Sequence, residues 1–412
     1  SAEDNTEESS ATIKNAFFTI QADYTNNKYT YSDANHKDDL FRYGYVGKFD
    51  TYKAKTYQNG SAIDSTSGTI YTGRIMNGWT DTLFQYTPGS ELGLGFSNTA
   101  LENYTNAYVN LFSDYKMSSY ISGYGADGVL RTAIDLQGKG LRNGELPSNV
   151  YSLFGNHGTM YNGSAKQENT QTTFKASGSA DIKSHEFSFG FEFEQRKDYY
   201  WGVGPMGLWG LMRQQANKHI LERDLLNPYP VFDANGIYQD TVNYDRLFIA
   251  EEQSDFDKNF RSEHNIGQLE FIDIDSYTPD AYSLDMFSPD ELLNSGSSLV
   301  YYYGYDIYGN KSTATPTLAS FFEEGSDRGI AAYNPIYQAG YIQDKFAIED
   351  LIFNIGLRVD RFDANQKVLK DRYLLYTAHK RNAQLGPNDV ITTTNHPSTI
   401  GDDYVVYVDD IE

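Results

Sequence analysis

Residues 185–196 read His-Glu-Phe-Ser-Phe-Gly-Phe-Glu-Phe-Glu-Gln-Arg. Successive side chains of a β-strand point to opposite faces, so this segment predicts a strand with two unlike faces. Four phenylalanines share one face: Phe187, Phe189, Phe191 and Phe193. Small and acidic residues share the other: Ser188, Gly190, Glu192 and Glu194. Such an apolar face packs on the core of a soluble sheet, or faces lipid in a transmembrane barrel whose lumen is wet.

The composition favours an all-β protein. The chain has 412 residues, of which 15% are aromatic, and it contains 35 Tyr, 35 Gly and no Cys. Aromatic residues are enriched in strands and at membrane interfaces. The formal net charge of -23 disfavours nucleic acid as a partner, because few cations are left to neutralise phosphates. No run of 18 apolar residues occurs, so we expect no transmembrane helix.

Alternating segments predict three hairpins. The first joins residues 173–182 to 185–196 through the two-residue turn Lys183-Ser184. The second joins residues 18–25 to 41–50 through the polar stretch 33–39, and the third joins residues 337–346 to 351–359 through Glu349-Asp350.

The connections between these hairpins are unusually long: 59–170, 197–336 and 363 onward. Short turns at one end and long loops at the other are the layout of an outer-membrane barrel. The smallest such barrels have about eight strands. We therefore predict an antiparallel transmembrane β-barrel segment of about six strands, with the remaining strands in another part of a longer protein. The strand-like residues 405–412 point the same way.

The long loops are predicted to contain short helices. Ser288-Pro289-Asp290-Glu291 combines a Ser N-cap, Pro at the first helical position and Glu in the capping-box position. Residues 206–225 have the apolar spacing of a longer amphipathic helix.

Two strand motifs resemble the barrel region of TonB-dependent receptors of the Bacteroidetes outer membrane. Gly340-Tyr341-Ile342-Gln343-Asp344-Lys345-Phe346 is followed by Asn354-Ile355-Gly356-Leu357-Arg358-Val359-Asp360-Arg361-Phe362-Asp363, and this pairing of "Y-x-Q-D" with "G-L-R-x-D" recurs in the family. Residues 191–198, 209–215 and 283–287 also resemble its members.

The resemblance implies active uptake of a nutrient across the bacterial cell outer membrane, driven by the inner-membrane TonB complex through a plug domain. The partners implied are outer-membrane lipid, the TonB complex and, as a further candidate, a surface lipoprotein. The sequence contains no plug-like segment, so we expect residues 1–412 to be part of one barrel domain whose plug lies elsewhere. The alternatives are a passive porin-like channel and a soluble secreted glycan-binding β-protein.

The candidate ligand-binding residues are aromatic or charged, because flat rings stack on sugars and on hydrophobic ligands alike. They are Trp79, Trp201, Trp209, Tyr301, Tyr302, Tyr303, Glu192, Glu194, Arg358 and Asp360. The aromatic residues fit an interfacial girdle or loop packing equally well.

No residue pattern in the chain predicts an enzyme or a cofactor. Glu192 and Glu194 have a spacing within the range of glycoside hydrolysis, although a charged lumen wall explains them as well. The seven His show no paired spacing for zinc, so no metal is predicted. Residues 233–236 and 273–275 resemble fragments of calcium loops, but neither completes one.

Overall fold

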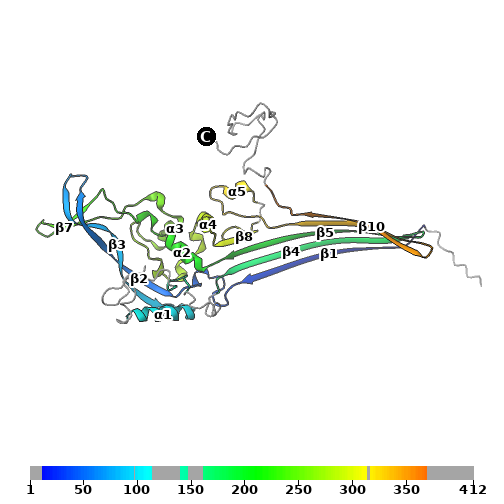
Figure 1. The fold of residues 1–412 in the computed structure, drawn as a ribbon, viewed down its shortest axis with the longest axis horizontal. Helices are drawn as coiled ribbons and strands as arrows, with labels where there is room; N and C mark the ends of the chain where they lie inside the picture. The colour runs from blue at the N-terminus through cyan, green and yellow to red at the C-terminus, as the bar shows by residue number, and fades with distance from the viewer. Residues whose placement is uncertain (1–11, 97, 114–139, 147–160, 313–315, 369–412) are drawn as a thin grey trace, which may run out of the picture.

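The computed structural model describes residues 12–96, 98–113, 140–146, 161–312 and 316–368. Figure 1 shows long strands running to one end of the molecule and loop segments gathered at the other. Within the described residues, the long sheet has the strand order β1 (Ile13–Tyr31), β4 (Ser164–Ile182), β5 (His185–Val203), β9 (Ile336–Ile348) and β10 (Leu351–Asp363). The short strand β8 (Val300–Tyr303) pairs with the end of β5.

Two of the predicted hairpins are confirmed. β4 and β5 pair antiparallel across Lys183-Ser184, with Ile182 opposite His185, and each strand is 19 residues long. β9 and β10 pair across Glu349-Asp350. Lys183 and Glu349 adopt positive φ angles of 57° and 53°, as tight hairpin turns require.

The second predicted hairpin is wrong. β1 pairs with β4 rather than with residues 41–50, so Phe18 lies opposite Gly178. Phe41, Tyr43, Tyr45 and Phe49 are buried instead: Phe41 lies in a short 3-10 helix at Leu40–Arg42, Tyr43 and Tyr45 follow it, and Phe49 lies in a strand of another sheet. Their alternation has the period of a strand, but it reflects packing against the loop core and not pairing with β1.

The register of the long sheet keeps the apolar residues of all five long strands on one face. One row across the strands is Phe18, Gly178, Phe189, Ile342 and Leu357. We call this side the apolar face, and most of its large side chains are exposed: Phe18, Ile20, Phe174, Phe189, Phe191, Ile342, Ile355, Leu357 and Val359. Phe189 is 55% exposed and Phe191 is 47% exposed, so no described segment covers the centre of this face.

A second sheet lies mostly in the regions predicted to be loops, although its first strand begins inside the predicted strand 41–50. Its order is β2 (Gly47–Ile63), β3 (Ile70–Pro88), β7 (Tyr238–Asn243) and β6 (Tyr229–Phe232). β2 and β3 form a long bulged hairpin, whereas β3 and β7 pair in parallel over a short stretch.

Short helices occur in the long connections, as predicted. The α-helices are α1 (Thr99–Ser113), α2 (Met206–Gln215), α3 (Asp255–His264), α4 (Pro289–Leu293) and α5 (Leu318–Phe322). The 3-10 helices are η1 (Leu40–Arg42), η2 (Gly89–Leu92), η6 (Lys218–Ile220), η7 (Ala250–Glu252), η8 (Ile274–Ser276), η9 (Pro279–Ala281), η10 (Leu284–Met286) and η11 (Asn294–Gly296).

Both predicted helix starts are confirmed. α4 has the expected capping box between Ser288 and Glu291. The helix expected over 206–225 is shorter, because Ala216 is extended and Asn217 is left-handed, which ends α2 after Gln215. Among the described residues, no helix is long and apolar enough to cross a membrane.

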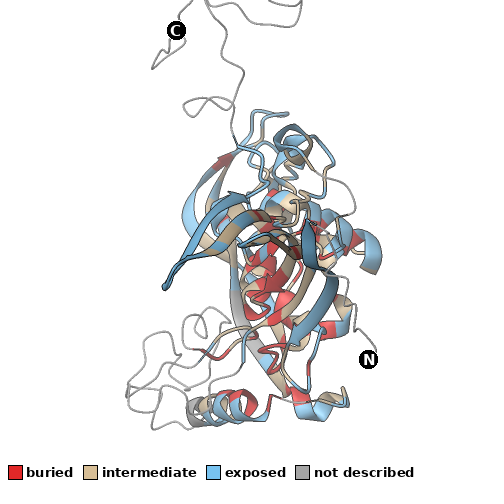
Figure 2. Cartoon of the chain, turned by 90° about the vertical axis from the view of Figure 1, so that its right-hand side faces the viewer, coloured by how far each residue is buried: buried red, intermediate tan, exposed pale blue. Residues whose placement is uncertain are grey.

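The hydrophobic core lies mainly among the loop segments, and the end of the long sheet joins it through Trp201 and Val203 of β5 and Val300 and Tyr302 of β8. Figure 2 shows the buried residues gathered around the helices, while the strands are mostly exposed or half-buried. Trp209 of α2 and Phe256 and Phe260 of α3 are fully buried there. Arg261 and Asp257, also buried, form an ion pair of 2.7 Å. The fold is therefore mostly β-sheet with a packed loop region, while the strand-like segment 405–412 lies outside the described residues.

Candidate functional site

The polar face of the long sheet forms a groove with a cavity of about 190 Å³. Residues from all five long strands line it, including Gln21 of β1, Lys175 of β4, Glu192 of β5, Tyr341 of β9 and Arg358 of β10. Side chains of the first and last strands line the same cavity only if the sheet curves toward this face. The polar side is therefore the concave side.

Ion pairs connect the strands across this groove. The Glu192 carboxylate lies 2.6 Å from the Lys175 ammonium and 3.7 Å from the Arg358 guanidinium. Arg358 also donates to Asp360 at 3.0 Å and to the Tyr337 hydroxyl at 2.8 Å. Tyr337 in turn donates to Asp360. The structure thus brings together Glu192, Arg358 and Asp360, which sequence reasoning selected separately.

Glu194 lies on the same face but has a different partner. Its carboxylate accepts a hydrogen bond from Arg196 at 2.7 Å. The two glutamates of the Glu192–Glu194 pair are thus held by different basic side chains.

Three of the predicted aromatic residues are buried in the loop core. The indole N–H of Trp201 donates to the Ile307 carbonyl at 3.0 Å, and that of Trp209 donates to the Tyr43 carbonyl at 3.2 Å. The Tyr302 hydroxyl donates to the Arg328 carbonyl at 2.6 Å. The indole N–H groups and the hydroxyl donate to protein carbonyls, and the rings are buried. The structure therefore places these three side chains in the packing of the protein and not at a ligand-binding surface.

Tyr301 and Tyr303 lie where β8 meets β5. Both rings contact Tyr200, with centroids 5.8 Å and 5.9 Å away. Tyr301 is 69% exposed and borders a cavity of about 530 Å³ together with Tyr31 and Tyr200. A partly exposed aromatic cluster of this kind fits either a ligand or a membrane interface.

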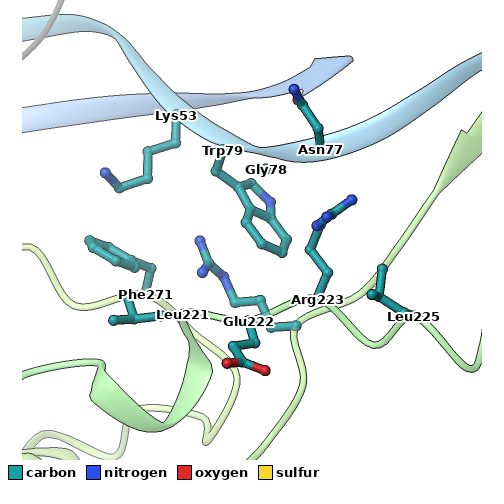
Figure 3. A pocket seen from close by; sticks show the side chains of 10 residues that line it. Lys53, Asn77, Gly78, Trp79, Leu221, Glu222, Arg223, Leu225 and Phe271 are labelled. Carbon is teal, nitrogen blue, oxygen red and sulfur yellow. The ribbon is translucent and has the colours of Figure 1, made fainter. Parts of the chain in front are cut away.

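Trp79 of β3 lines a third cavity, of about 460 Å³, which we call the Trp79 pocket. Figure 3 shows Lys53 and Trp79 on the β2–β3 hairpin facing Arg223 and Phe271 from two loop segments. The Arg246 guanidinium lies 3.9 Å from the centroid of the Trp79 ring. Sequence reasoning missed the three basic residues, because no local pattern brings them together.

No cluster of three or more potential metal ligands occurs among the described residues. The two segments that resemble calcium loops have other roles. The Asp233 carboxylate accepts backbone N–H groups of Asn235 and Ile237, as in an Asx turn. Asp275 forms a bidentate ion pair with Arg213, whose Nε and Nη2 atoms each donate to one carboxylate oxygen at 2.7 Å.

Comparison of the chain with protein-family models, with curated proteins and with solved structures gave no match.

Proposed function

We propose that this chain forms part of the transmembrane β-barrel of a TonB-dependent receptor that imports a nutrient across the bacterial outer membrane. The observation that carries the proposal is the difference between the two faces of the long sheet. The apolar face is exposed over five adjacent strands, while the opposite face is charged, concave and linked by ion pairs. A barrel wall needs this arrangement, because lipid lies outside it and water inside.

The length of the apolar face, measured along the membrane normal, supports the proposal. On β10 the apolar positions run from Leu351 to Val359, and all of them are exposed. At about 3.4 Å per residue these eight steps cover about 27 Å along the strand, which is about 21 Å across the membrane at a tilt of ~40°. The apolar band of such barrels is about 25 Å tall.

The edges of the long sheet support it as well. Within the described residues, β1 pairs only with β4 and β10 pairs only with β9. A long exposed edge is an aggregation hazard in a soluble protein, and a closed barrel removes it. In the proposed receptor, further strands of the full-length protein pair with β1 and β10.

The energy-coupled part of the proposal rests on the resemblance of β9 and β10 to receptor strands. The resembling segments, residues 340–346 and 354–363, form one hairpin whose polar side includes Tyr341 and Arg358 of the groove. In such a receptor the TonB complex acts through a plug that lies outside this chain, and the loop region is the part that meets the nutrient. A surface lipoprotein is a further candidate partner there.

The test is a spin label placed at position 191 or 192 of the full-length protein in lipid vesicles. We expect oxygen, which concentrates in lipid, to relax the label at position 191 more than a water-soluble agent does. At position 192 we expect the water-soluble agent to be more effective. Low access of both agents at position 191 would mean that protein covers the apolar face, which would favour a soluble glycan-binding β-protein.

A further inference from the structure

The Trp79 pocket is formed by the β2–β3 hairpin on one side and by loop segments on the other (Figure 3). Trp79 and Phe271 provide aromatic walls, and Lys53, Arg223 and Arg246 provide three positive charges. Glu222 also lines the pocket, and no ion pair among the described residues joins its carboxylate to Arg223 or Arg246. The walls therefore combine flat apolar surface with two arginines that form no ion pair among the described residues.

Arg246 is a half-buried cation with no acidic partner among the described residues. Its guanidinium carbon lies 3.9 Å from the Trp79 centroid and 5.2 Å from the Phe271 centroid, so aromatic rings replace water around it. Burial lowers the pKa of Arg246 from its ordinary value, and no carboxylate opposes this shift. The one hydrogen bond it donates to the described protein goes to the Ile220 carbonyl, at 2.9 Å.

Arg223 adds a second guanidinium to the same pocket. It donates a hydrogen bond to the Met76 carbonyl of β3 and lies 5.6 Å from the Tyr244 ring. No carboxylate of the described chain lies within ion-pair distance of it. A guanidinium has five N–H donors, so each arginine keeps several donors for a ligand.

Arginines without an acidic partner are unusual in this chain. The net charge is -23, and carboxylates are plentiful. Arg213, Arg261 and Arg328 of the loop region each pair with an Asp at 2.7 to 2.9 Å. Arg223 and Arg246 face each other across a β-bridge, so their like charges repel, and an anion between the two guanidinium groups would relieve that repulsion.

We propose that the Trp79 pocket binds an oxyanionic group, meaning a carboxylate, sulfate or phosphate, through Arg223 and Arg246. A guanidinium group can bind two oxygens of such an anion at once through two parallel N–H donors. Lys53 adds positive charge on the hairpin side, and its ammonium lies 4.3 Å from the Phe271 centroid. The pocket volume of about 460 Å³ admits either a free inorganic ion or the acidic sugar of a larger ligand. This proposal does not depend on the transport function.

The first test is calorimetric titration of the full-length protein in detergent with phosphate, glucuronate and glucose at constant ionic strength. We expect glucuronate to bind and glucose not to bind. Binding of phosphate as well would identify a general oxyanion site, whereas binding of glucuronate alone would identify a site for acidic sugars. Absence of binding by both anions, or equal binding of glucose and glucuronate, would overturn the proposal.

The second test separates ligand binding from a structural role of the arginines. Leu225 lines the pocket and is 56% exposed, so its replacement should not unfold the loop region. Leu225→Glu adds a carboxylate at the pocket and should weaken anion binding at least about tenfold, while Leu225→Gln should not. Equal affinities of these two variants would contradict the proposal.

Substitution of a pocket arginine completes the test. Arg246→Gln should weaken binding at least about tenfold, since hydrogen bonds to charged groups are the strong ones. Lys218→Gln is the matched control, because Lys218 carries the same charge on a neighbouring segment but does not line the pocket. Equal loss in both variants would point to a general charge effect and refute the assignment.

Discussion

An arginine at position 191 should destabilise the protein strongly if the apolar face contacts lipid. Phe191 lies in the row Ile20, Ala176, Phe191, Gly340 and Val359, where no neighbour offers a carboxylate. It is four residues from Phe187 and two from Phe193, the two ends of the apolar stretch on β5, so about 14 Å and about 7 Å of strand separate it from them. Position 191 is therefore near the proposed midplane of the membrane.

The expected cost of Phe191→Arg is about 2 to 4 kcal/mol, the range for a basic residue at the midplane of a barrel. The assay is unfolding of the full-length protein from lipid vesicles in urea, compared with the unmodified protein. Ser188→Arg is the matched control, because it introduces the same side chain on the same strand but on the polar face, opposite Gln343. The control should change stability by no more than about 0.5 kcal/mol.

Equal costs for the two variants would refute the reasoning, because both faces would then have the same environment. A cost of Phe191→Arg below about 0.5 kcal/mol would mean that the apolar face is exposed to water in the working protein.

Four further outcomes are expected. Protease added to whole cells should cut the long loops and spare Lys183, whereas cleavage at Lys183 alone would reverse the topology. Collapse of the proton gradient should abolish accumulation of the nutrient but not its binding, and uptake that resists an uncoupler would favour a passive porin-like channel. Burial raises the pKa of Asp273 to about 6, above its ordinary unfolded value of about 3.9. The native state therefore binds the proton more tightly than the unfolded state, and the free energy of unfolding falls as pH rises through about 6. Asp273→Asn has no carboxyl to ionise, so it should remove this pH-dependent loss, which amounts to up to about 3 kcal/mol at pH ~8. Denaturation at several pH values measures the difference. Arg261→Met leaves the fully buried Asp257 carboxylate without its cation and should weaken the loop core by about 3 to 5 kcal/mol, as measured by hydrogen exchange in α3.

The hairpins that the sequence predicts correctly are those whose turns fix the pairing. A two-residue turn at Lys183-Ser184 places Lys175 opposite Glu192, so this ion pair follows from the turn alone. The same argument places Tyr341 opposite Arg358 in the β9–β10 hairpin. Part of the groove was thus predictable from local sequence.

Pairings across long connections were not predictable in this way. β1 pairs with β4, and β5 pairs with β9, although long segments separate both pairs in sequence. Alternation shows that a segment is a strand but not which strand is its neighbour. The Trp79 pocket is harder still, because its walls come from residues 53, 79, 223, 246 and 271, and no period relates these positions.

The groove and the Trp79 pocket differ in what an incoming ligand must displace. In the groove, an anion that binds Lys175 or Arg358 must compete with Glu192 and Asp360, which already hold these cations. In the pocket, an anion that binds Arg246 displaces no described carboxylate. The Arg246 guanidinium is partly shielded from water, so it attracts that anion more strongly than an exposed cation would. We therefore expect a charged ligand to be captured at the pocket and to interact weakly along the groove. In the proposed receptor, capture at the loop region followed by weak contact along the groove is the order that release on the far side of the membrane requires.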